Sequence, residues 1–335
     1  MERDEIIIRN AIVHILDSTI GMPVLSDYLL ELGPDLNDFL RGHIYRIATS
    51  DDMKNCNFNK EESYVYKCIE NFSEDNIIPI SQEIATYLYT IMTQNIDIIP
   101  ADLLVVTYQI NSTIHLALLK MNYKETYIHY AQAAESGNYN DIIKQKVTLP
   151  NESSKLTEAA LINLSDYSIQ LVEKKYEVNG VKTNYLSQVF LQCQTKLSQK
   201  AKLNIITKAV DQINQKYFEE DLDRQMDTKA AIYQEYVEQG SISVESISDK
   251  LFQDQVELKE EFEEKLGKYN LQTEEVKPQN KQTTRKFEKQ FLKTDTGIEI
   301  NIPMEQYNDN SVEFINNLDG TISVLIKNIN HISSK

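Results

Sequence analysis

The sequence lacks the features that mark several large classes of protein. Its 335 residues include no Trp, nine Gly, seven Pro and three Cys. No apolar run reaches the roughly 18 to 20 residues that a membrane-spanning helix needs, so we expect no membrane partner. The segment 1–8 has neither the basic start nor the long apolar stretch of a secretory signal. We therefore expect a cytoplasmic protein.

The few cysteines and histidines form no disulfide or metal pattern. Cys56, Cys68 and Cys193 make no Cys-x-x-Cys pair, and the five His are scattered along the chain. The sequence also contains no glycine-rich phosphate-binding loop and no nucleophile motif. We predict no cofactor, no metal site and no recognisable catalytic residue.

Acidic pairs are frequent but lack the spacing of a recognisable active site. Asp51-Asp52 and Glu61-Glu62 are examples, and we interpret such pairs as solvated faces and helix ends. Two-metal nucleases also use clustered carboxylates, so a metal-dependent nuclease stays an alternative that the abundance of acids alone motivates.

What the sequence does contain is enough apolar material for a core. Hydrophobic residues make up 41% and charged residues 25% of the chain, as is typical of globular proteins. The patterns of period 3.6 and period 2 predict an α+β fold. It consists of an N-terminal mixed domain with helices and an antiparallel β-meander, a central helical segment, and a small C-terminal β-meander.

The N-terminal part mixes both patterns. We predict that Ser81 caps the third helix and that Asn179-Gly180 forms a type I′ turn. The predicted strands are 5–16, 24–30, 103–109, 114–120, 123–131, 142–149, 159–164, 169–178 and 181–186, and the predicted helices are 36–49, 61–72 and 82–94.

The remainder divides into helices and a β unit. Ser243 is a predicted helix cap, and Gly240 a predicted helix end. Helices are predicted at 194–218, 223–238, 244–252 and 256–268, and a four-stranded meander at 287–293, 298–302, 312–316 and 321–326. The expected domains are 1–190 (α+β), 191–272 (helical), a polar linker at 273–284, and 285–335 (β unit).

The charge of the chain is strongly negative and unevenly distributed. The formal net charge is −17, and segment 219–264 holds fifteen acidic and four basic residues. Segment 196–208, by contrast, holds four lysines and no acid: Lys196, Lys200, Lys202 and Lys208. Lys196, Lys200 and Lys208, together with Asn204, are spaced four residues apart. This spacing places them along one side of the predicted helix. Ammonium groups in such a row can track phosphates.

A second basic tract covers the predicted linker and the strand after it. Residues 277–293 hold six basic side chains and one acid. The candidate DNA-binding residues from both tracts are Lys196, Lys200, Lys202, Lys208, Arg285, Lys286 and Lys289. An alternative interpretation is that both tracts solubilise the chain or pair with its acidic segments.

Five stretches resemble a known bacterial family. They are IIRNAIVHIL at 7–16, LNIITKAVDQI at 203–213, ISVESISDKL at 242–251, GIEINI at 297–302 and LDGTISVLIK at 318–327. Their order and spacing are similar to those of the nucleoid-associated proteins that include YejK, also called NdpA. The likeness runs from end to end and rests on collinearity, since no stretch carries a catalytic signature.

The resemblance implies a non-enzymatic protein of the bacterial nucleoid. Such a protein would bind double-stranded DNA with little sequence preference and work with type II topoisomerase subunits. A homodimer would help, because it brings two weak basic surfaces together. The alternative hypothesis is a scaffold whose acidic helices, within 219–264, recruit a DNA-handling enzyme such as a type II topoisomerase.

Overall fold

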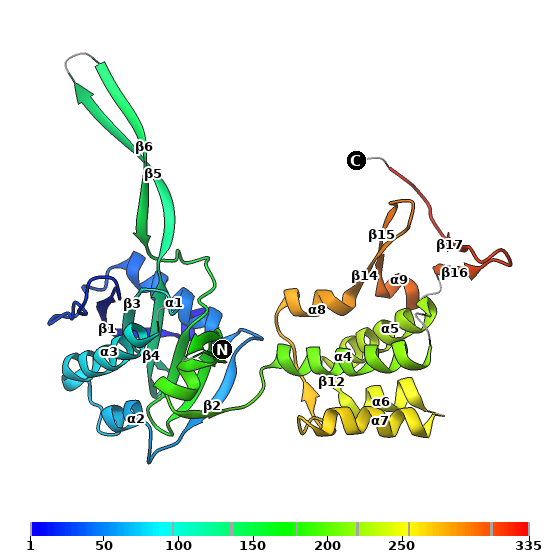
Figure 1. The fold of residues 1–335 in the computed structure, drawn as a ribbon, viewed down its shortest axis with the longest axis horizontal. Helices are drawn as coiled ribbons and strands as arrows, with labels where there is room; N and C mark the ends of the chain where they lie inside the picture. The colour runs from blue at the N-terminus through cyan, green and yellow to red at the C-terminus, as the bar shows by residue number, and fades with distance from the viewer. Residues whose placement is uncertain are drawn as a thin grey trace. The chain divides into compact units, whose positions relative to one another are not determined.

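A large antiparallel sheet organises the N-terminal part of the chain, and helices with small hairpins make up the rest (Figure 1). The computed structural model describes residues 2–95, 97–134, 137–178, 180–218, 221–253, 255–308 and 311–333. Within this part, the chain divides into two units, Met1–Leu197 and Ser198–Lys335. The predicted α+β class is confirmed. None of the described helices is long and apolar enough to cross a membrane.

In the described part of the first unit, seven strands form one antiparallel sheet in the order β1-β3-β4-β7-β8-β2-β11. Their bounds are β1 (Ile7–Leu16), β2 (Lys54–Phe58), β3 (Ala101–Ile110), β4 (Thr113–Asn122), β7 (Ala159–Asn163), β8 (Ser168–Val172) and β11 (Cys193–Thr195). A hairpin of β9 (Tyr176–Val178) and β10 (Val181–Thr183) follows β8. β11 pairs with β2, so a distant segment closes the edge of the sheet.

Helices cover both faces of this sheet. Successive strand side chains point to opposite faces. Leu104 of β3 therefore packs with Leu40 of α1, whereas Leu103 packs with Ile84 of α3. Burial on both sides explains why β3 is apolar at most positions. The helices of this unit are η1 (Arg3–Glu5), α1 (Pro34–Ala48), α2 (Tyr64–Ile69), η2 (Glu74–Asn76), α3 (Ile77–Gln94) and the π-helix η3 (Leu186–Phe190).

β5 (Lys124–Ala134) and β6 (Gly137–Thr148) leave the sheet and extend away from it as a separate ribbon (Figure 1). The sequence predicts both strands as part of the meander, and this prediction is wrong. They pair with each other, from Lys124 opposite Thr148 to Ala134 opposite Gly137, and with no strand of the large sheet among the described residues.

A buried polar cluster lies beside the last residue of β4, just before the ribbon begins. The Glu158 carboxylate accepts hydrogen bonds from Asn122 at 2.6 Å, from the Tyr176 hydroxyl at 2.7 Å and from the Tyr185 hydroxyl. Nζ of Lys120 lies 3.2 Å from the same carboxylate, and both charged groups are almost fully buried. These partners satisfy a carboxylate that would be very costly to bury alone.

The second unit contains helices and short hairpins. Its helices are α4 (Gln199–Tyr217), α5 (Leu222–Gln239), α6 (Val244–Phe252), α7 (Val256–Gly267), α8 (Lys281–Glu288) and α9 (Met304–Asn308). Its strands are β12 (Ile242–Ser243), β13 (Glu275–Val276), β14 (Lys289–Lys293), β15 (Glu299–Pro303), β16 (Val312–Asn316) and β17 (Ile322–Ile326). As predicted, Gly240 ends α5 and the Ser243 side chain caps α6.

The stretch 273–284, for which the sequence predicts a linker, carries β13 and the first turn of α8. β13 pairs with β12, which anchors this polar stretch to the helices. Beyond it, Met226 of α5 packs with Ile302, Met304 and Val312. The helices and the C-terminal hairpins therefore share a core, because the apolar side chains of each hairpin need the helical surface for burial.

The two predicted C-terminal hairpins are confirmed, since β14 pairs with β15 and β16 pairs with β17. They do not join into the predicted four-stranded meander, because they form separate sheets in the described part of the chain. β15 and β16 do not pair because α9 occupies the connection between them. A helix cannot form the tight turn that joins two strands of a hairpin.

Three predictions in the first unit also need comment. The strand expected at 24–30 is reduced to a bridge between Ile15 and Val24, because its backbone meets β1 at isolated points only. Ser81 lies inside α3, which begins four residues earlier, and its hydroxyl donates to the Ile78 carbonyl. Asn179 lies outside the described residues, although Val178 and Val181 on either side of its turn pair as expected.

Candidate nucleic-acid interface

α4 buries its apolar row and leaves lysines at the surface. Leu203, Ile206 and Val210 are buried, and Ser198 caps the helix by accepting from the Ala201 N–H. Lys208 is exposed. The periodicity that buries one side of the helix therefore presents Lys208, the last lysine of the first basic tract, on the other side.

α8 brings the second basic tract to the first. Nζ of Lys286 donates to Oδ1 of Asn204 at a distance of 2.9 Å. Phe287, the next residue, is buried with its ring edge-on to Tyr236 of α5, which holds α8 in place. Asn204 lies one helical turn before Lys208, so two lysines from tracts far apart in the sequence become neighbours.

A cavity of about 250 Å³ lies between α4, α5 and α8. Among the described residues that line it are three lysines and one acid, namely Lys208, Lys229, Lys286 and Asp211, and the lining is completed by Leu203, Asn204, Thr207, Ile232 and Phe287. We call Lys208, Lys229 and Lys286 the basic cluster. It is a local excess of positive charge on an acidic chain.

Lys229 is the member that sequence reasoning missed. It lies on α5, within the segment that holds fifteen acids against four bases, so counting charges along the chain hides it. Burial lowers the pKa of Lys229, and the nearby Asp211 carboxylate opposes this shift. The signal in the sequence that could have identified Lys229 is its position on the side of α5 that packs toward α4.

A second cavity, of about 480 Å³, continues from the first along α4 and α5. The two cavities share Thr207, Asp211, Lys229 and Ile232. The rest of the second lining is mostly uncharged and polar: Asn214, Gln215, Leu222, Gln225, Thr228 and Gln290. The result is a groove with lysines at one end and neutral hydrogen-bonding groups along its length.

Lys196 and Lys202, which the sequence predicts to bind DNA, do not line the cavity of the basic cluster. Nζ of Lys202 lies 2.5 Å from the Glu274 carboxylate, and only 14% of its side chain is exposed. Lys196 precedes α4 and belongs to the first unit, where its N–H donates to the Asn55 carbonyl. The prediction that the helix begins at residue 194 is wrong, because residues 193–195 pair with β2 as β11.

The other predicted residues lie near the ends of the two tracts. Arg285 on α8 and Lys289 at the start of β14 are exposed, and Lys200 on α4 is half-buried. None of the three lines the cavity. They lie on the same helices as the basic cluster or at their ends, so they extend the two tracts away from it.

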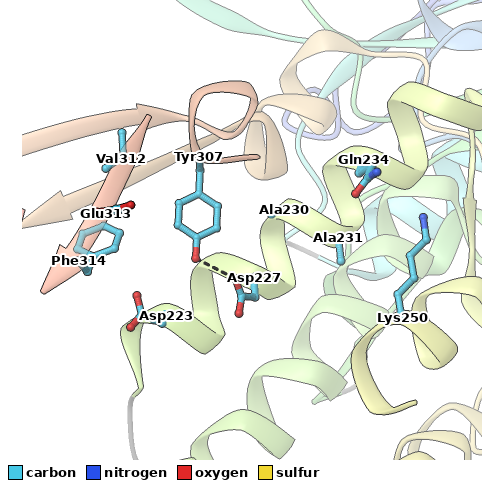
Figure 2. Close-up of a pocket in the computed structure, with 10 residues that line it drawn as sticks. All are labelled: Asp223, Asp227, Ala230, Ala231, Gln234, Lys250, Tyr307, Val312, Glu313 and Phe314. Atoms are coloured by element: carbon cyan, nitrogen blue, oxygen red, sulfur yellow. Dashed lines mark hydrogen bonds between the residues drawn. The ribbon is translucent and has the colours of Figure 1, made fainter. Parts of the chain in front are cut away.

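A third cavity, of about 600 Å³, is lined by more acidic than basic side chains, unlike the cavity of the basic cluster. Figure 2 shows Asp223 and Asp227 one turn apart on α5, with the Tyr307 hydroxyl donating to Asp227 at 2.8 Å and Glu313 on the facing hairpin. Lys250 is its basic lining residue. Across the described part of the chain, no group of three or more His, Cys, Asp or Glu side chains is arranged to hold a metal ion. This acidic surface is unsuited to phosphates.

Comparison with known proteins supports the resemblance noted in the sequence. A family model described as the nucleoid-associated protein YejK matches residues 12–332. The chain belongs to this family. The match starts inside β1 and ends beyond β17, so membership in the YejK family extends over both units. The chain is thus a nucleoid-associated protein. A search of curated proteins gave no match.

Proposed function

We propose that this nucleoid-associated protein binds double-stranded DNA directly, without catalysis and with little sequence preference. The observation that supports the proposal is the convergence of Lys208 and Lys286, from two separate basic tracts, on one cavity that also contains Lys229. Lysines of this kind contact phosphates, and phosphate contacts carry no direct sequence information. Weak sequence preference follows from that chemistry.

The net charge of −17 makes a local site necessary. DNA affinity arises largely from counterions that are released when basic groups neutralise phosphates. At an ionic strength of 0.1 M, charges more than about 10 Å away are largely screened. A compact basic cluster can therefore bind phosphates even though the chain as a whole repels them.

Further phosphate contacts are proposed for the residues that extend the cluster. Lys200, Arg285 and Lys289 lie on α4, on α8 and at the start of β14, and would follow the DNA backbone away from the cavity. Phosphate contacts by Lys196 and Lys202 stay predictions from the sequence. The pairing of Lys202 with Glu274 weakens its case, because a phosphate would have to displace that carboxylate.

Fluorescence anisotropy of a labelled duplex, measured at several salt concentrations, tests the proposal. The slope of log K against log salt is about −0.9 for each phosphate neutralised. We expect the variant Lys208→Glu/Lys286→Glu to bind at least about 10-fold more weakly and to reduce the magnitude of that slope by about two.

The matched control is Lys182→Glu/Lys268→Glu. Both lysines are exposed, lie outside the basic cluster, and undergo the same change of charge. We expect the control to retain the wild-type slope. Equal affinities and slopes in the wild-type protein and both variants would overturn the assignment of DNA binding to the basic cluster.

The surface of α7 supports a second candidate function, in which the chain recruits a basic partner such as a topoisomerase subunit. A shallow site there is lined by Glu257, Glu260, Glu261 and Glu264 together with Lys216, Lys265 and Lys268. This function predicts a flat duplex titration. It also predicts salt-sensitive capture of the subunit without DNA, and loss of that capture in Glu257→Lys/Glu260→Lys.

A further inference from the structure

The ribbon of β5 and β6 exposes large apolar side chains. Tyr139 is 57% and Ile128 is 49% exposed, a large fraction for residues of these types. Other exposed apolar side chains of the ribbon are Tyr127, Tyr130, Ile142, Ile143 and Val147. A two-stranded ribbon alone is marginally stable in water, and contiguous apolar surface marks interaction sites. The ribbon therefore needs a partner.

The strand pairing divides these side chains between two faces. Residues directly opposite each other share a face, and Ile128 is opposite Ile143. Tyr130 and Tyr139 lie on the same face, nearer the turn. We call this the apolar face. The other face carries Tyr127, His129 and Ile142 beside an ion pair between Lys144 and Glu125.

We propose that the apolar face is the contact surface for the same face of a second copy of this chain. The charges on it favour this occupant over DNA. Between Thr126 and Gln145, Asp141 is the one charged residue on this face within the described ranges, and the Tyr139 hydroxyl donates to it at 3.2 Å. Lys124 lies at the base of the same face, where its Nζ donates to the Ser154 hydroxyl at 3.0 Å. Beyond Lys124 the face carries a carboxylate and no ammonium group, which repels phosphates.

Two-fold symmetry makes the apolar face complementary to itself. An axis through the Ile128–Ile143 pair would place the tyrosine-rich half of one ribbon over the half of the other that carries Thr126 and Gln145. Asp141 would then meet hydroxyl and amide donors of the second copy rather than a second carboxylate. The isoleucines would pack around the axis.

The dimensions of the ribbon agree with a dimer. A strand of 11 residues, such as β5, spans about 35 Å, and two strands with their side chains give a face on the order of 500 Å². Two copies would bury about 1,000 Å² in total, which is the lower limit for a specific interface. The contact is thus large enough for a dimer that dissociates on dilution.

Sedimentation equilibrium of the full chain tests the proposal. We expect a monomer–dimer equilibrium in which Ile128→Glu/Ile143→Glu weakens the dimer by at least about 100-fold, since each substitution acts twice across the axis. These side chains belong to no core of the first unit among the described residues, so the variant should keep its circular dichroism. The control is Asn138→Asp/Asn140→Asp, which adds the same charge to exposed residues on the opposite face and should keep the dimer.

A fluorescent reporter identifies the face directly. The chain has no Trp, so Tyr130→Trp introduces a single one on the apolar face. Its emission should shift to shorter wavelength as the protein concentration rises through the dimer equilibrium. A monomer at all concentrations would overturn the proposal, and so would a dimer whose Trp emission stays that of a solvated indole.

The outcome is separable from that of DNA binding. Lys208→Glu/Lys286→Glu should leave the dimer intact, and Ile128→Glu/Ile143→Glu should leave the basic cluster intact. If the isoleucine variant instead abolishes duplex binding by a chain that is monomeric throughout, the ribbon is a DNA-binding arm. The second-copy assignment would then be overturned.

Discussion

At the residue scale, burial decides how the histidines behave. The Ser26 N–H donates to Nδ1 of His14 at 3.1 Å, so the proton of the neutral ring is on Nε2, which lies 2.9 Å from the Ser81 hydroxyl. His14 therefore donates to Ser81 instead of accepting its proton, and the pair is no activated nucleophile. It ties β1 to α3. The scattered histidines of the sequence thus include a packing residue with a specific partner.

We predict that buried His14 and His43 make the first unit less stable in mild acid. Burial lowers the pKa of each from 6.5 to about 4, so the unfolded chain binds protons more readily. Their contribution is fully present above about pH 6.5 and is lost as the pH falls toward 4. At pH 5 the loss is about 2 kcal/mol per histidine.

Urea unfolding at pH 7 and pH 5 measures this loss. In His43→Leu, the loss of free energy of unfolding between pH 7 and pH 5 should be smaller than in the wild-type protein by the contribution of one histidine, about 2 kcal/mol. His331→Leu, which changes an exposed residue, should remove none. The same pH dependence in the wild-type protein and in His43→Leu would contradict the prediction.

At the element scale, the end of α5 shows how one backbone conformation directs the next helix. Gly240 has a φ of +68°, and its N–H donates to the Tyr236 carbonyl at 2.8 Å. The chain then turns so that α6 packs back on α5. There, Glu235 accepts from the Ser246 hydroxyl at 2.6 Å and from Nζ of Lys250 at 2.8 Å.

Gly240→Ala should lower the free energy of unfolding by about 1 kcal/mol, because a side chain disfavours positive φ. No atom lies within 4 Å of the position of the added Cβ, so the loss reflects backbone conformation and not a clash. The control is Gly33→Ala before α1, where φ is −79° and the space is also open. Urea unfolding that shows equal losses in both variants would contradict this account.

At the scale of the whole molecule, each unit has its own core. The cores that contain the sheet draw on residues up to Cys193, whereas the core of α5 and the C-terminal hairpins begins at Leu222. The ribbon belongs to the first unit and the basic cluster to the second. Proposed self-association and proposed DNA binding are therefore carried by different units.

This division predicts the behaviour of two fragments. Residues 1–197 should self-associate like the full chain without binding duplex DNA. Residues 198–335 should bind duplex DNA with the slope of log K against log salt that one wild-type basic cluster gives. The affinity should be about 10-fold lower, because without the ribbon two basic clusters are no longer linked in one dimer. Circular dichroism confirms that each fragment is folded. A folded fragment 198–335 without affinity for DNA would contradict the prediction.

Sequence reasoning succeeded where a few neighbouring residues decide the structure. Ser243 caps α6 because its side chain reaches the Ser246 N–H, and Gly240 ends α5 because it adopts a positive φ. It failed where a distant segment decides. Residues 24–30 have strand composition, but their backbone meets β1 at isolated points only.

The sequence by itself determined the α+β class, most helices and turns, the uneven charge and, through collinear stretches, membership of the YejK family. These properties depend on period, capping and turn chemistry within a few residues of each other. Tertiary structure alone decided that β5 and β6 leave the sheet and that Lys229 joins Lys208 and Lys286 in one cavity. Such juxtapositions depend on which apolar faces pack together across the chain, and local periodicity contains no information about the partner of a face.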